Sequence, residues 1–350
     1  MKGKMKAIRY YSPGDIRLEE VAVPAIRPNE MLVEVKVALT CGTDVKMSKR
    51  GHPKVKPPMT LGHEFSGIIT KVGRRVASRF KVGDKVTAAN SAPCNSCFFC
   101  KTGKPNLCEH LLETLIGFSV DGAYAEYVRI PAPIVWQNTY KVPDSVSFEE
   151  AALLEPLACA INGNDSANIH LGDTVVIIGS GPIGLIHLQL ARLKGASKVI
   201  VADLRKERLR IADALGADVV IDASKENQLS QVKELTNGLG ADVVIEAVGL
   251  PQTWEMAVDM TRKAGTTLFF GGCPSGSKIT LDTERIHYED LTLRGIFHHT
   301  PLSVLKAYEL ISSGRFNGKP LITDRMLLSE TEAALLKMGR GECIKIAIMP

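Results

Sequence analysis

The pattern of hydrophobic and polar residues changes once along the chain, near residue 155. Before that point, short runs in which apolar and polar residues alternate predict strands between turns rich in Gly and Pro, at 31–41, 65–73, 84–90 and 123–130. The clearest run is the first, which places on one face Met31, Val33, Val35, Val37 and Leu39. The first part of the chain is therefore predicted to be β-rich, with long loops in its proline-bearing stretches, 52–60 and 131–143.

Beyond residue 155, short unbroken apolar runs alternate with helical patterns. A buried strand and a glycine turn in 173–184 lead into a predicted helix at 185–196. Further strands are predicted at 198–203, 218–222, 242–249, 266–272 and 291–297, with helices between them that include 205–215 and 251–264. Strands and helices in alternation predict a parallel, doubly wound sheet. The tail, 300–350, carries one helical pattern and ends in the strand-like run CIKIAIM.

Composition narrows the class of protein. The 350 residues have room for two domains, and a net charge of +5 with 23% charged residues is too mild for a nucleic-acid or membrane surface. The chain has no run of about 18 apolar residues and no signal-peptide pattern at its start, so we expect a cytoplasmic protein without membrane or nucleic-acid partners. Thiols stay reduced in that compartment, which favours metal binding over disulfides for a cysteine cluster.

Four of the eight cysteines form a C-x2-C-x2-C-x7-C run within residues 92–110: Cys94, Cys97, Cys100 and Cys108. The long last gap differs from iron–sulfur ferredoxins, in which the fourth cysteine follows after three residues and precedes proline. Four thiolates suit the closed tetrahedral shell of a structural zinc, with four unmetallated buried thiols as the alternative. A closed shell leaves no open position, so this predicted zinc lobe stabilises the fold and does no catalysis.

Residues 179–184 read G-x-G-x-x-G, and a second predicted strand ends in Asp203. A glycine turn between a strand and a helix, with an acidic residue in this place, is a dinucleotide-binding fingerprint. Asp203 would accept hydrogen bonds from the ribose hydroxyls, which favours NAD over NADP, although Arg205, Lys206 and Arg208 could instead pair with a 2′-phosphate. The cofactor-binding residues predicted here are Gly179, Gly181, Pro182, Ile183, Gly184, Asp203 and Arg208.

Further candidate ligands are far apart in the sequence: Cys41 in CGTD, His63 and Glu64 in GHEF, and Glu155 in LLEPL. Spacing alone does not join them. With the glycine turn and the four-cysteine run, in this chain order, they make the sequence resemble the zinc-containing medium-chain alcohol and polyol dehydrogenases, most of all the sorbitol dehydrogenase-like branch. The resemblance extends from MKAIRYY to the tail ITDRMLLSETEAALL.

The resemblance implies a catalytic zinc as well as the structural one. Cys41 and His63 match two of its ligands, and either Glu155 or Glu64 matches the third. Asp44 matches the residue that orients the histidine ligand. Thr43 matches the hydroxyl that contacts the substrate oxygen and takes its proton, while the hydride passes to the nicotinamide. The implied α/β fold has a GroES-like catalytic domain, 1–155 and 300–350, and an inserted Rossmann NAD-binding domain, 156–299.

Two departures from the family pattern leave the substrate open. Lys46 stands where many relatives carry a proton-transferring histidine, and His298 and His299 stand where sorbitol dehydrogenases carry an arginine–tyrosine pair. Lys46 could serve proton transfer or an anionic substrate. Three other cysteines have apolar neighbours and are expected in the core: Cys159, Cys273 and Cys343.

The sequence thus predicts a zinc-dependent oxidoreductase that moves a hydride from a sorbitol-like polyol or another secondary alcohol to NAD, giving a ketone. L-Threonine, butanediol and a sugar-alcohol phosphate are alternative substrates, and the EPL at 155–157 disfavours threonine. A nucleotide-binding relative without catalysis is the alternative of another class, and the intact Cys41, His63 and Glu155 speak against it. By the same resemblance we expect a homodimer or homotetramer.

Overall fold

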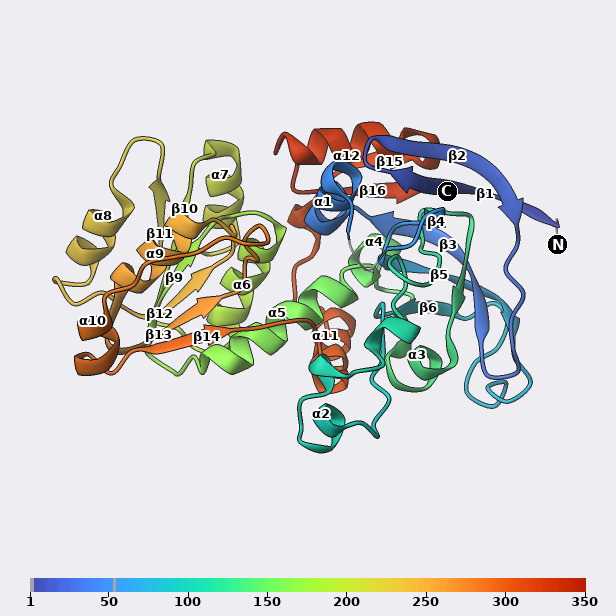
Figure 1. Cartoon of the computed structure of the whole chain (residues 1–350), viewed down its shortest axis with the longest axis horizontal. Coiled ribbons are helices and arrows are strands. Elements are labelled where there is room, and N and C mark those ends of the chain that lie inside the picture. The colour runs from blue at the N-terminus through green and yellow to red at the C-terminus, as the bar shows by residue number, and fades with distance from the viewer. Residues whose placement is uncertain (1–2, 53–54) are drawn as a thin grey trace. The chain divides into compact units, whose positions relative to one another are not determined.

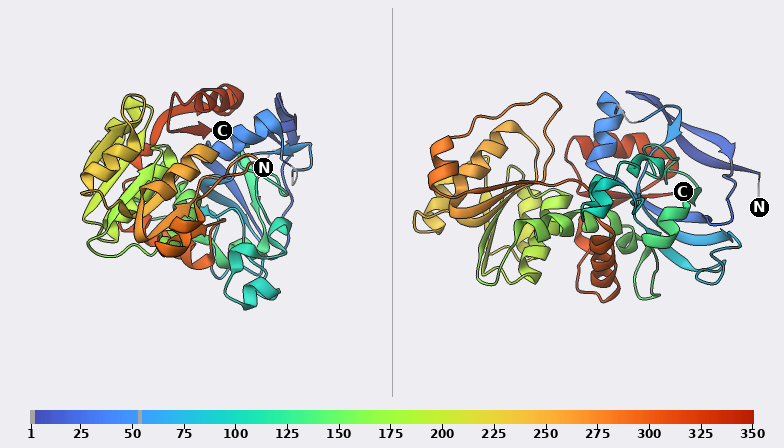
Figure 2. Two further views of the ribbon diagram at one scale, coloured as in Figure 1. Left: turned by 60° about the vertical axis from the view of Figure 1, so that its left-hand side comes forward. Right: turned by 60° about the horizontal axis from the view of Figure 1, so that its bottom comes forward.

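The computed structural model describes residues 3–52 and 55–350 of the chain. The chain folds into two compact units: unit 1 is Met1–Ala158 with His299–Pro350, and unit 2 is Cys159–His298. The boundaries predicted from the sequence were 155/156 and 299/300. The first and last strands, β1 (Lys4–Ser12) and β16 (Lys345–Met349), both belong to unit 1, so unit 2 is inserted into unit 1 (Figure 2).

The strands of unit 1 form two sheets (Figure 1). The smaller sheet is antiparallel, in the order β2-β1-β4, with β2 at Asp15–Ala22 and β4 at Met59–Thr60. The larger sheet has the order β15-β16-β3-β5-β6-β8, with β7 also paired to β3, and only β15 and β16 run parallel. Its other strands are β3 (Met31–Leu39), β5 (Glu64–Val72), β6 (Lys85–Ala88), β7 (Tyr127–Ile130), β8 (Thr139–Lys141) and β15 (Ile322–Leu327).

Short helices connect the strands of unit 1. The α-helices are α1 (Gly42–Arg50), α2 (Phe98–Lys101), α3 (Ala132–Gln137), α4 (Phe148–Ala151), the beginning of α5 (Leu154–Ala167), α11 (Pro301–Ser312) and α12 (Thr331–Gly339). The 3-10 turns are η1 (Pro105–Leu107), η2 (Leu111–Glu113), η3 (Lys319–Leu321) and η4 (Leu328–Glu330). In the described part of the chain, no helix combines the length and apolar character that crossing a membrane requires.

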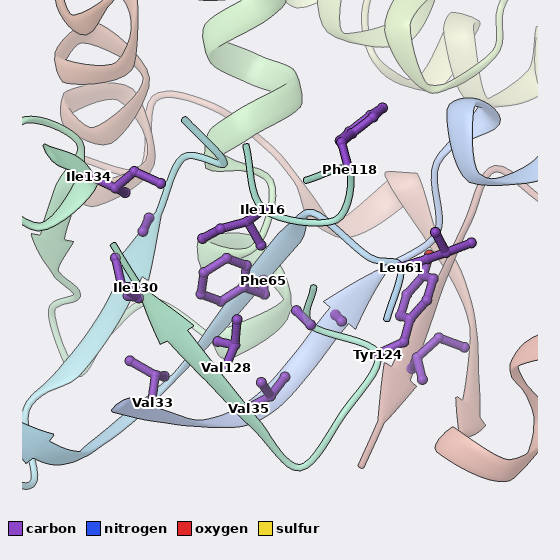
Figure 3. Packing of buried hydrophobic residues seen from close by; sticks show 14 of the residues in the cluster. Val33, Val35, Leu61, Phe65, Ile116, Phe118, Tyr124, Val128, Ile130 and Ile134 are labelled. Atoms are coloured by element: carbon purple, nitrogen blue, oxygen red, sulfur yellow. The ribbon is translucent and has the colours of Figure 1, made fainter. Parts of the chain in front are cut away.

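The core of unit 1 packs against one face of the larger sheet. Val33 and Val35 of β3 and Phe65 of β5 are buried in one apolar cluster with Ile116 and Val128, and Figure 3 shows the ring of Phe65 beside these side chains. The strands predicted at 31–41, 65–73, 84–90 and 123–130 each overlap an observed strand. Alternation located the buried face correctly for Met31, Val33 and Val35, but a register shift between Val35 and Val37 places Ala38 in this cluster instead of Val37 and Leu39.

Two predicted loops of unit 1 are partly wrong. The stretch 131–143 contains α3 and β8, and Pro131 and Pro133 lie at the beginning of α3, where a missing amide hydrogen costs no helical hydrogen bond. In the stretch 52–60, residues 59 and 60 form β4, while residues 53 and 54 lie outside the described residues.

Unit 2 contains one six-stranded parallel sheet in the order β11-β10-β9-β12-β13-β14. In chain order this is 3-2-1-4-5-6, the order of dinucleotide-binding sheets. The strands are β9 (Thr174–Ile178), β10 (Lys198–Asp203), β11 (Val219–Asp222), β12 (Ala241–Glu246), β13 (Thr261–Phe269) and β14 (Thr292–Gly295). The predicted doubly wound sheet is confirmed.

Helices cover both faces of this sheet (Figure 1). They are the rest of α5, α6 (Pro182–Leu193), α7 (Lys206–Ala214), α8 (Gln228–Leu235), α9 (Pro251–Met260) and α10 (Thr283–Tyr288). Val232 of α8 and Ala257 of α9 pack with Val176 and Ile178 of β9. Gly184 of α6 instead faces Ile177, on the opposite side of the same strand.

The helix predicted at 251–264 is shorter than expected. It ends at Met260, and residue 261 begins β13. Thr261 is extended, at φ −76° and ψ 134°, and its hydroxyl bonds to the Ala257 carbonyl at 2.8 Å and to Thr267 at 2.7 Å. A β-branched residue with this local hydrogen bond leaves the helix readily, which the apolar pattern alone did not reveal.

A buried histidine in α6 makes the stability of unit 2 depend on pH. His187 has no exposed surface, its ring contacts the amide of Asn164 and the edge of Phe270, and burial lowers its pKa to about 3. The unfolded chain binds a proton here below about pH 6.5, whereas the folded chain does not until about pH 3. Stability therefore falls as the pH drops through this window, by up to about 3 kcal/mol between pH 7 and pH 4.

The variant His187→Gln keeps a polar side chain but cannot titrate. We expect its free energy of unfolding, measured by urea titration, to fall less steeply than that of the wild type between pH 6.5 and pH 4. The difference in slope should approach about 1.4 kcal/mol per pH unit. Parallel curves for the two proteins in this range would show that His187 is protonated in the folded chain.

Candidate functional site

Cys41 lies where strand β3 passes into helix α1. It is the N-cap residue of α1, with extended backbone at φ −125° and ψ 149°. Its sulfur accepts a hydrogen bond from the Thr43 backbone N–H at 3.5 Å, and its own N–H donates to Asp44 Oδ2 at 3.2 Å. This reciprocal cap fixes the direction of the Cys41 side chain at the positive end of the helix dipole.

Strand pairing brings His63 and Glu64 to Cys41. Strand β5 begins at Glu64, which pairs with Leu39 of β3, two residues before Cys41. The ligand atoms of Cys41, His63 and Glu64 all lie within 4.8 Å of one another, although Cys41 and His63 are 22 positions apart in the sequence. His63 and Glu64 are buried. Thiol, imidazole and carboxylate are the donor types that zinc binds in proteins.

A buried carboxylate lies beside His63. Asp44 Oδ1 lies 3.3 Å from His63 Nδ1, and the Tyr124 hydroxyl donates to Asp44 Oδ2 at 2.7 Å. With Nδ1 facing Asp44, Nε2 is the ring nitrogen left for a metal. Burial alone lowers the pKa of His63, but the charges of Asp44 and Cys41 outweigh it and raise that pKa well above its usual value. The surroundings of the ring thus favour positive charge.

Glu64 has a partner that the sequence analysis missed. Lys345, the first residue of β16, is buried, and its Nζ lies 2.8 Å from Glu64 Oε1 and 2.5 Å from Oε2. Burial lowers the pKa of Lys345, but the Glu64 carboxylate outweighs it and raises that pKa above its usual value. A lysine inside the apolar run CIKIAIM is the sequence signal that could have pointed to this pair, because an isolated charge is rarely buried without a partner.

The other predicted residues of this site lie on two helices of unit 1. Glu155 is buried in the first turn of α5 and is not part of the group formed by Cys41, His63 and Glu64, but its charge contributes to the raised pKa of Lys345. Thr43 is half-buried in the first turn of α1, and Lys46, one turn further, is exposed. Residues three apart on a helix share a side, so Thr43 and Lys46 lie on one side of α1.

The four predicted lobe cysteines converge. Their sulfurs all lie within 4.8 Å of one another, with Cys94 and Cys100 at 4.0 Å and Cys97 and Cys108 at 3.9 Å. These distances are too long for disulfide bonds. They match the edge of about 3.8 Å in a tetrahedron of sulfurs about 2.3 Å from a central zinc. The residues present therefore fit a zinc ion.

Hydrogen-bond donors surround these sulfurs. The Cys97 backbone N–H donates to Cys94 Sγ at 3.3 Å, as does the Ser96 hydroxyl at 3.4 Å. The Ser96 hydroxyl and the backbone amides of Ser96 and Cys97 lower the pKa of Cys94 to about 5. Burial and the neighbouring thiols raise the pKa of Cys100 to about 12. Phe98, beside the cysteines, is exposed and meets Phe99 edge to face.

The glycine turn of unit 2 has the backbone of a dinucleotide site. Gly179 has φ +97°, a conformation that side chains disfavour, and a Cβ on Gly184 would lie 1.8 Å from the Gly179 carbonyl oxygen. A Cβ on Gly181 would meet only the Arg208 guanidinium, at 3.7 Å, so the turn is open on that side. Pro182 and Ile183 form the first turn of α6, where backbone N–H groups can bind a pyrophosphate.

Asp203 ends β10 and is tied to the glycine turn. Its Oδ2 accepts from the Ser180 backbone N–H at 2.7 Å, and its Oδ1 accepts from the Arg205 backbone N–H at 2.9 Å. Arg208, in α7, is half-buried. The structure therefore gathers the predicted cofactor residues at the carboxyl ends of β9 and β10, where open α/β sheets bind their ligands.

The remaining candidates have mixed outcomes. His299 is buried, with Nε2 3.1 Å from Asn90 Oδ1, and His298 is partly exposed, with φ +61° and its carbonyl bonded to Asn162. Cys343 is buried as predicted. Cys159 and Cys273 are partly exposed, so their placement in the core was wrong. Apolar neighbours in the sequence did not reveal that Cys159, in α5, and Cys273, in the loop after β13, are only partly covered.

Two family models match the chain. Residues 27–144 match the alcohol dehydrogenase GroES-like domain, and residues 182–313 match the zinc-binding dehydrogenase domain. The chain is 34% identical to a sorbitol dehydrogenase of Bacillus subtilis over 99% of this chain and 97% of that protein. It is 36% identical to an L-threonine 3-dehydrogenase of Symbiobacterium thermophilum over 100% of this chain and 99% of that protein.

Solved structures agree with these matches. A zinc-binding dehydrogenase of Sinorhizobium meliloti bound to NADP superposes with a TM-score of 0.92 at 32% identity, covering 100% of both chains. An alcohol dehydrogenase of Escherichia coli complexed with NADH has a TM-score of 0.89 at 29% identity, over 99% of this chain and 100% of the other. Zinc and a nicotinamide cofactor follow for the present protein, as does a small-molecule substrate.

The predicted resemblance and fold class are thereby confirmed: this chain is an oxidoreductase of the zinc-containing medium-chain alcohol and polyol dehydrogenase family, on its sorbitol dehydrogenase-like side.

Proposed function

We propose that this enzyme transfers a hydride from a secondary alcohol or polyol, sorbitol-like in structure, to NAD and releases a ketone. The observation that carries the proposal is the grouping of the half-buried Cys41, at the beginning of α1, with the buried His63, which lies against Asp44, in a chain that also has the glycine turn. A cysteine–histidine pair suits a catalytic zinc, and the glycine turn suits the hydride acceptor.

We propose two zinc ions per chain. Cys41, His63 and Glu155 would hold the catalytic ion, and the four lobe cysteines would hold the structural one. Glu64 is the less suitable third ligand, because both of its carboxylate oxygens contact Lys345 Nζ. When bound, the catalytic zinc supplies a Lewis acid for the alcohol oxygen, and the nicotinamide supplies the hydride acceptor.

Side chains of unit 1 would do the remaining work. Asp44 keeps the His63 ring in one orientation, and Tyr124 keeps Asp44 in place. The Thr43 hydroxyl, in the first turn of α1, is in the right segment to take the proton that leaves the alcohol. Lys46, on the same side of α1 and exposed, could pass that proton to water or attract a negatively charged substrate.

NAD is the cofactor that Asp203 favours over NADP. The carboxylate is fixed by two backbone N–H groups at the end of β10, where a ribose hydroxyl can donate to it and a 2′-phosphate would be repelled. The relatives include one structure bound to NADP and one with NADH, so membership of the family does not decide between the two.

The variant Asp203→Asn tests this choice. It keeps the shape of the side chain and an oxygen that can accept from Ser180, but it removes the negative charge. We expect the ratio of kcat/KM for NAD to kcat/KM for NADP to fall by about 10- to 100-fold, the effect of losing one charged hydrogen bond together with one repulsion. Asp222→Asn, at the end of the neighbouring strand β11, is the matched control and should leave the ratio unchanged. An unchanged ratio in Asp203→Asn would show that another residue selects the cofactor.

A sugar-alcohol phosphate is the second substrate class that an observation favours, because Lys46 offers an exposed cation on the same side of α1 as Thr43. L-Threonine and butanediol have relatives in the family but no residue here that favours them.

Zinc-replete protein should be mixed with NAD, and separately with NADP, and a panel of polyols, secondary alcohols, L-threonine and sugar-alcohol phosphates. Formation of reduced nicotinamide is the readout. The proposal expects the strongest response from a neutral polyol or secondary alcohol with NAD. A response to phosphates alone would assign Lys46 to the substrate, and silence with NAD still bound would favour a relative without catalysis.

We further propose that the protein is a homodimer or homotetramer. Strand β14 is the last strand of its sheet in the described part of the chain, pairing with β13 on one side, and all four of its residues are exposed or half-buried. An unpaired edge of this kind can pair with the same edge of a second copy. Light scattering after size exclusion gives the assembly state.

A further inference from the structure

Strand β12 ends in Glu246, a glutamate with no exposed surface at the edge of the sheet where the cofactor is proposed to bind. We propose that Glu246 is a positioning residue for the cofactor. It holds two loops, 247–249 and 270–272, in the form that receives the nicotinamide half of NAD, and it acts through these loops without touching the nicotinamide. This inference rests on the proposed function, in which unit 2 binds NAD through the glycine turn and Asp203.

The order of the strands indicates where the nicotinamide half would lie. Asp203 ends β10, which pairs with one side of β9, and the glycine turn follows β9 directly. Strand β12 pairs with the other side of β9, and β13 comes next (Figure 1). A dinucleotide crosses such a sheet at the point where the strand order reverses, here between β9 and β12. With its adenosine ribose at Asp203, the cofactor would extend toward the loops that follow β12 and β13.

The side chain of Glu246 fixes the loop after β12. Its Oε1 accepts hydrogen bonds from the backbone N–H groups of Val248 at 2.9 Å and Gly249 at 2.8 Å, and from the Thr253 hydroxyl at 2.8 Å. Thr253 lies in the first turn of α9, so one oxygen atom joins the strand, the loop and the helix. An apolar side chain at this position would leave these donors without their acceptor, a cost that the loop would reduce by moving.

The backbone of Glu246 fixes the second loop. Its carbonyl accepts from the N–H of Phe270 at 3.0 Å and from that of Gly271 at 2.9 Å. The Gly271 carbonyl in turn accepts from the indole N–H of Trp254 at 2.8 Å. The two loops are in contact, since a Cβ on Gly271 would lie 2.4 Å from the Gly249 nitrogen. A change at Glu246 therefore reaches both loops.

The first loop also touches the glycine turn. A Cβ on Gly179 would lie 2.7 Å from Val248 Cγ2, so the Val248 side chain packs directly on the turn. Val248 and Leu250 are exposed although both are apolar. Sites for small molecules and cofactors are lined mainly by apolar side chains, with a few polar groups that fix orientation. Exposed apolar side chains beside the proposed pyrophosphate site, on a loop fixed by a buried carboxylate, suit the ring of the nicotinamide.

The two oxygens of Glu246 differ in a way that allows a precise test. The hydrogen bonds to the loop and to α9 all end on Oε1, whereas Oε2 has no hydrogen-bond partner among the described residues and lies against Gly271. Glu246→Gln can keep the accepting oxygen through its amide carbonyl, while Glu246→Met keeps the length of the side chain and loses the acceptor. The pair of variants therefore separates hydrogen bonding from the space that the side chain fills.

ADP separates the two halves of the cofactor, because it contains the adenosine and the pyrophosphate of NAD and lacks the nicotinamide riboside. We expect Glu246→Met to raise the Kd for NAD by at least about tenfold, the size of one or two lost hydrogen bonds, with the Kd for ADP within about twofold of wild type. Glu246→Gln should stay within about threefold of wild type for both ligands. Glu234→Gln, on the exposed side of α8, is the matched control and should change neither. Isothermal titration calorimetry measures all four proteins.

Trp254 gives a second readout that does not need turnover. Its ring stacks on Phe269 with centroids 4.2 Å apart, and its indole N–H bonds to the second loop. The chain has two tryptophans, so Trp254 alone emits in a Trp136→Phe background. We expect NAD to change this emission and ADP to leave it unchanged. The same emission change with ADP, or no change at saturating NAD, would contradict the placement of the nicotinamide half at these loops.

Several binding results would overturn the role of Glu246. Equal losses for NAD and ADP in Glu246→Met would mean that Glu246 supports the whole unit, and unchanged affinities would mean that the loops do not depend on it. A Glu246→Gln protein as weak as Glu246→Met would mean that the accepting oxygen is not what matters.

If Glu246→Met does not fold, Thr253→Val decides the matter, because it removes one donor to Oε1. The Kd for NAD should then rise by about threefold with that for ADP unchanged, and Thr253→Ser, which keeps the hydroxyl, should match wild type. A Thr253→Val protein with the NAD affinity of wild type would overturn the inference. Wild-type protein that binds neither NAD nor ADP would instead contradict the proposed cofactor site itself.

Discussion

Replacement of Cys41 by serine is expected to lower kcat by at least about 1,000-fold, equivalent to about 4 kcal/mol of transition-state stabilisation. A serine hydroxyl stays protonated at neutral pH and is a poor zinc ligand, so the proposed catalytic ion would lose the donor fixed at the N-cap of α1. NAD binding should persist, because the residues proposed to bind it all belong to unit 2. Steady-state rates and a titration of NAD binding measure the two effects separately.

Cys273→Ser is the matched control for this substitution. Cys273 is partly exposed and belongs to unit 2, outside both cysteine-containing groups proposed to bind zinc. We expect its kcat to remain within about twofold of wild type, as for a surface substitution. A Cys41→Ser enzyme whose turnover is within about tenfold of wild type would contradict the assignment of Cys41 to the catalytic metal.

Replacement of Cys97 by serine is expected to act on stability and not on chemistry. Two pairs of lobe sulfurs lie 3.9 and 4.0 Å apart, and the helical turns α2 and η1 of the lobe bury no side chains. Loss of one ligand should cost at least about 4 kcal/mol of the binding energy that structural zinc contributes to folding. For a unit of this size, that loss lowers the melting temperature by about 8–16 °C.

The measurements are calorimetric melting and zinc content per chain, with Cys273→Ser again as the control. The folded fraction of Cys97→Ser should keep a kcat close to that of the wild type. Protein that melts normally but has no activity would mean that the roles proposed for the two cysteine groups are exchanged. Treatment of wild-type protein with a strong chelator should reproduce the fall in melting temperature.

Local sequence patterns predicted most of the fold, because most elements bury a regular face. The strand 198–203 was located to the residue, and the sheet of unit 2 followed from its unbroken apolar runs. The hairpin β1–β2 was not predicted. Strand β2 has no fully buried residue, so its pattern of apolar and polar positions carries little signal. Helix α9 was predicted too long, since the end of a helix depends on hydrogen bonds such as those of Thr261.

The candidate site could be predicted only in part, for a physical reason. The four lobe cysteines are close in sequence, and their spacing alone indicates a metal. Cys41 and His63 meet because β3 pairs with β5, a long-range contact that spacing does not encode. The partners of the two carboxylates, Tyr124 for Asp44 and Lys345 for Glu64, come from still more distant segments and appeared only in the folded chain.

The central claim is direct hydride transfer from an alcohol carbon to NAD at the Cys41–His63 site. The most direct test uses the alcohol that responds best in the panel, with deuterium at the carbon that is oxidised, and follows the label by mass spectrometry of the reduced nicotinamide. We predict one deuterium per reduced nicotinamide in wild type, and labelled product that forms at least about 1,000-fold more slowly in Cys41→Ser. Reduced nicotinamide that carries hydrogen from water, or labelled product formed by Cys41→Ser at the wild-type rate, would contradict the claim.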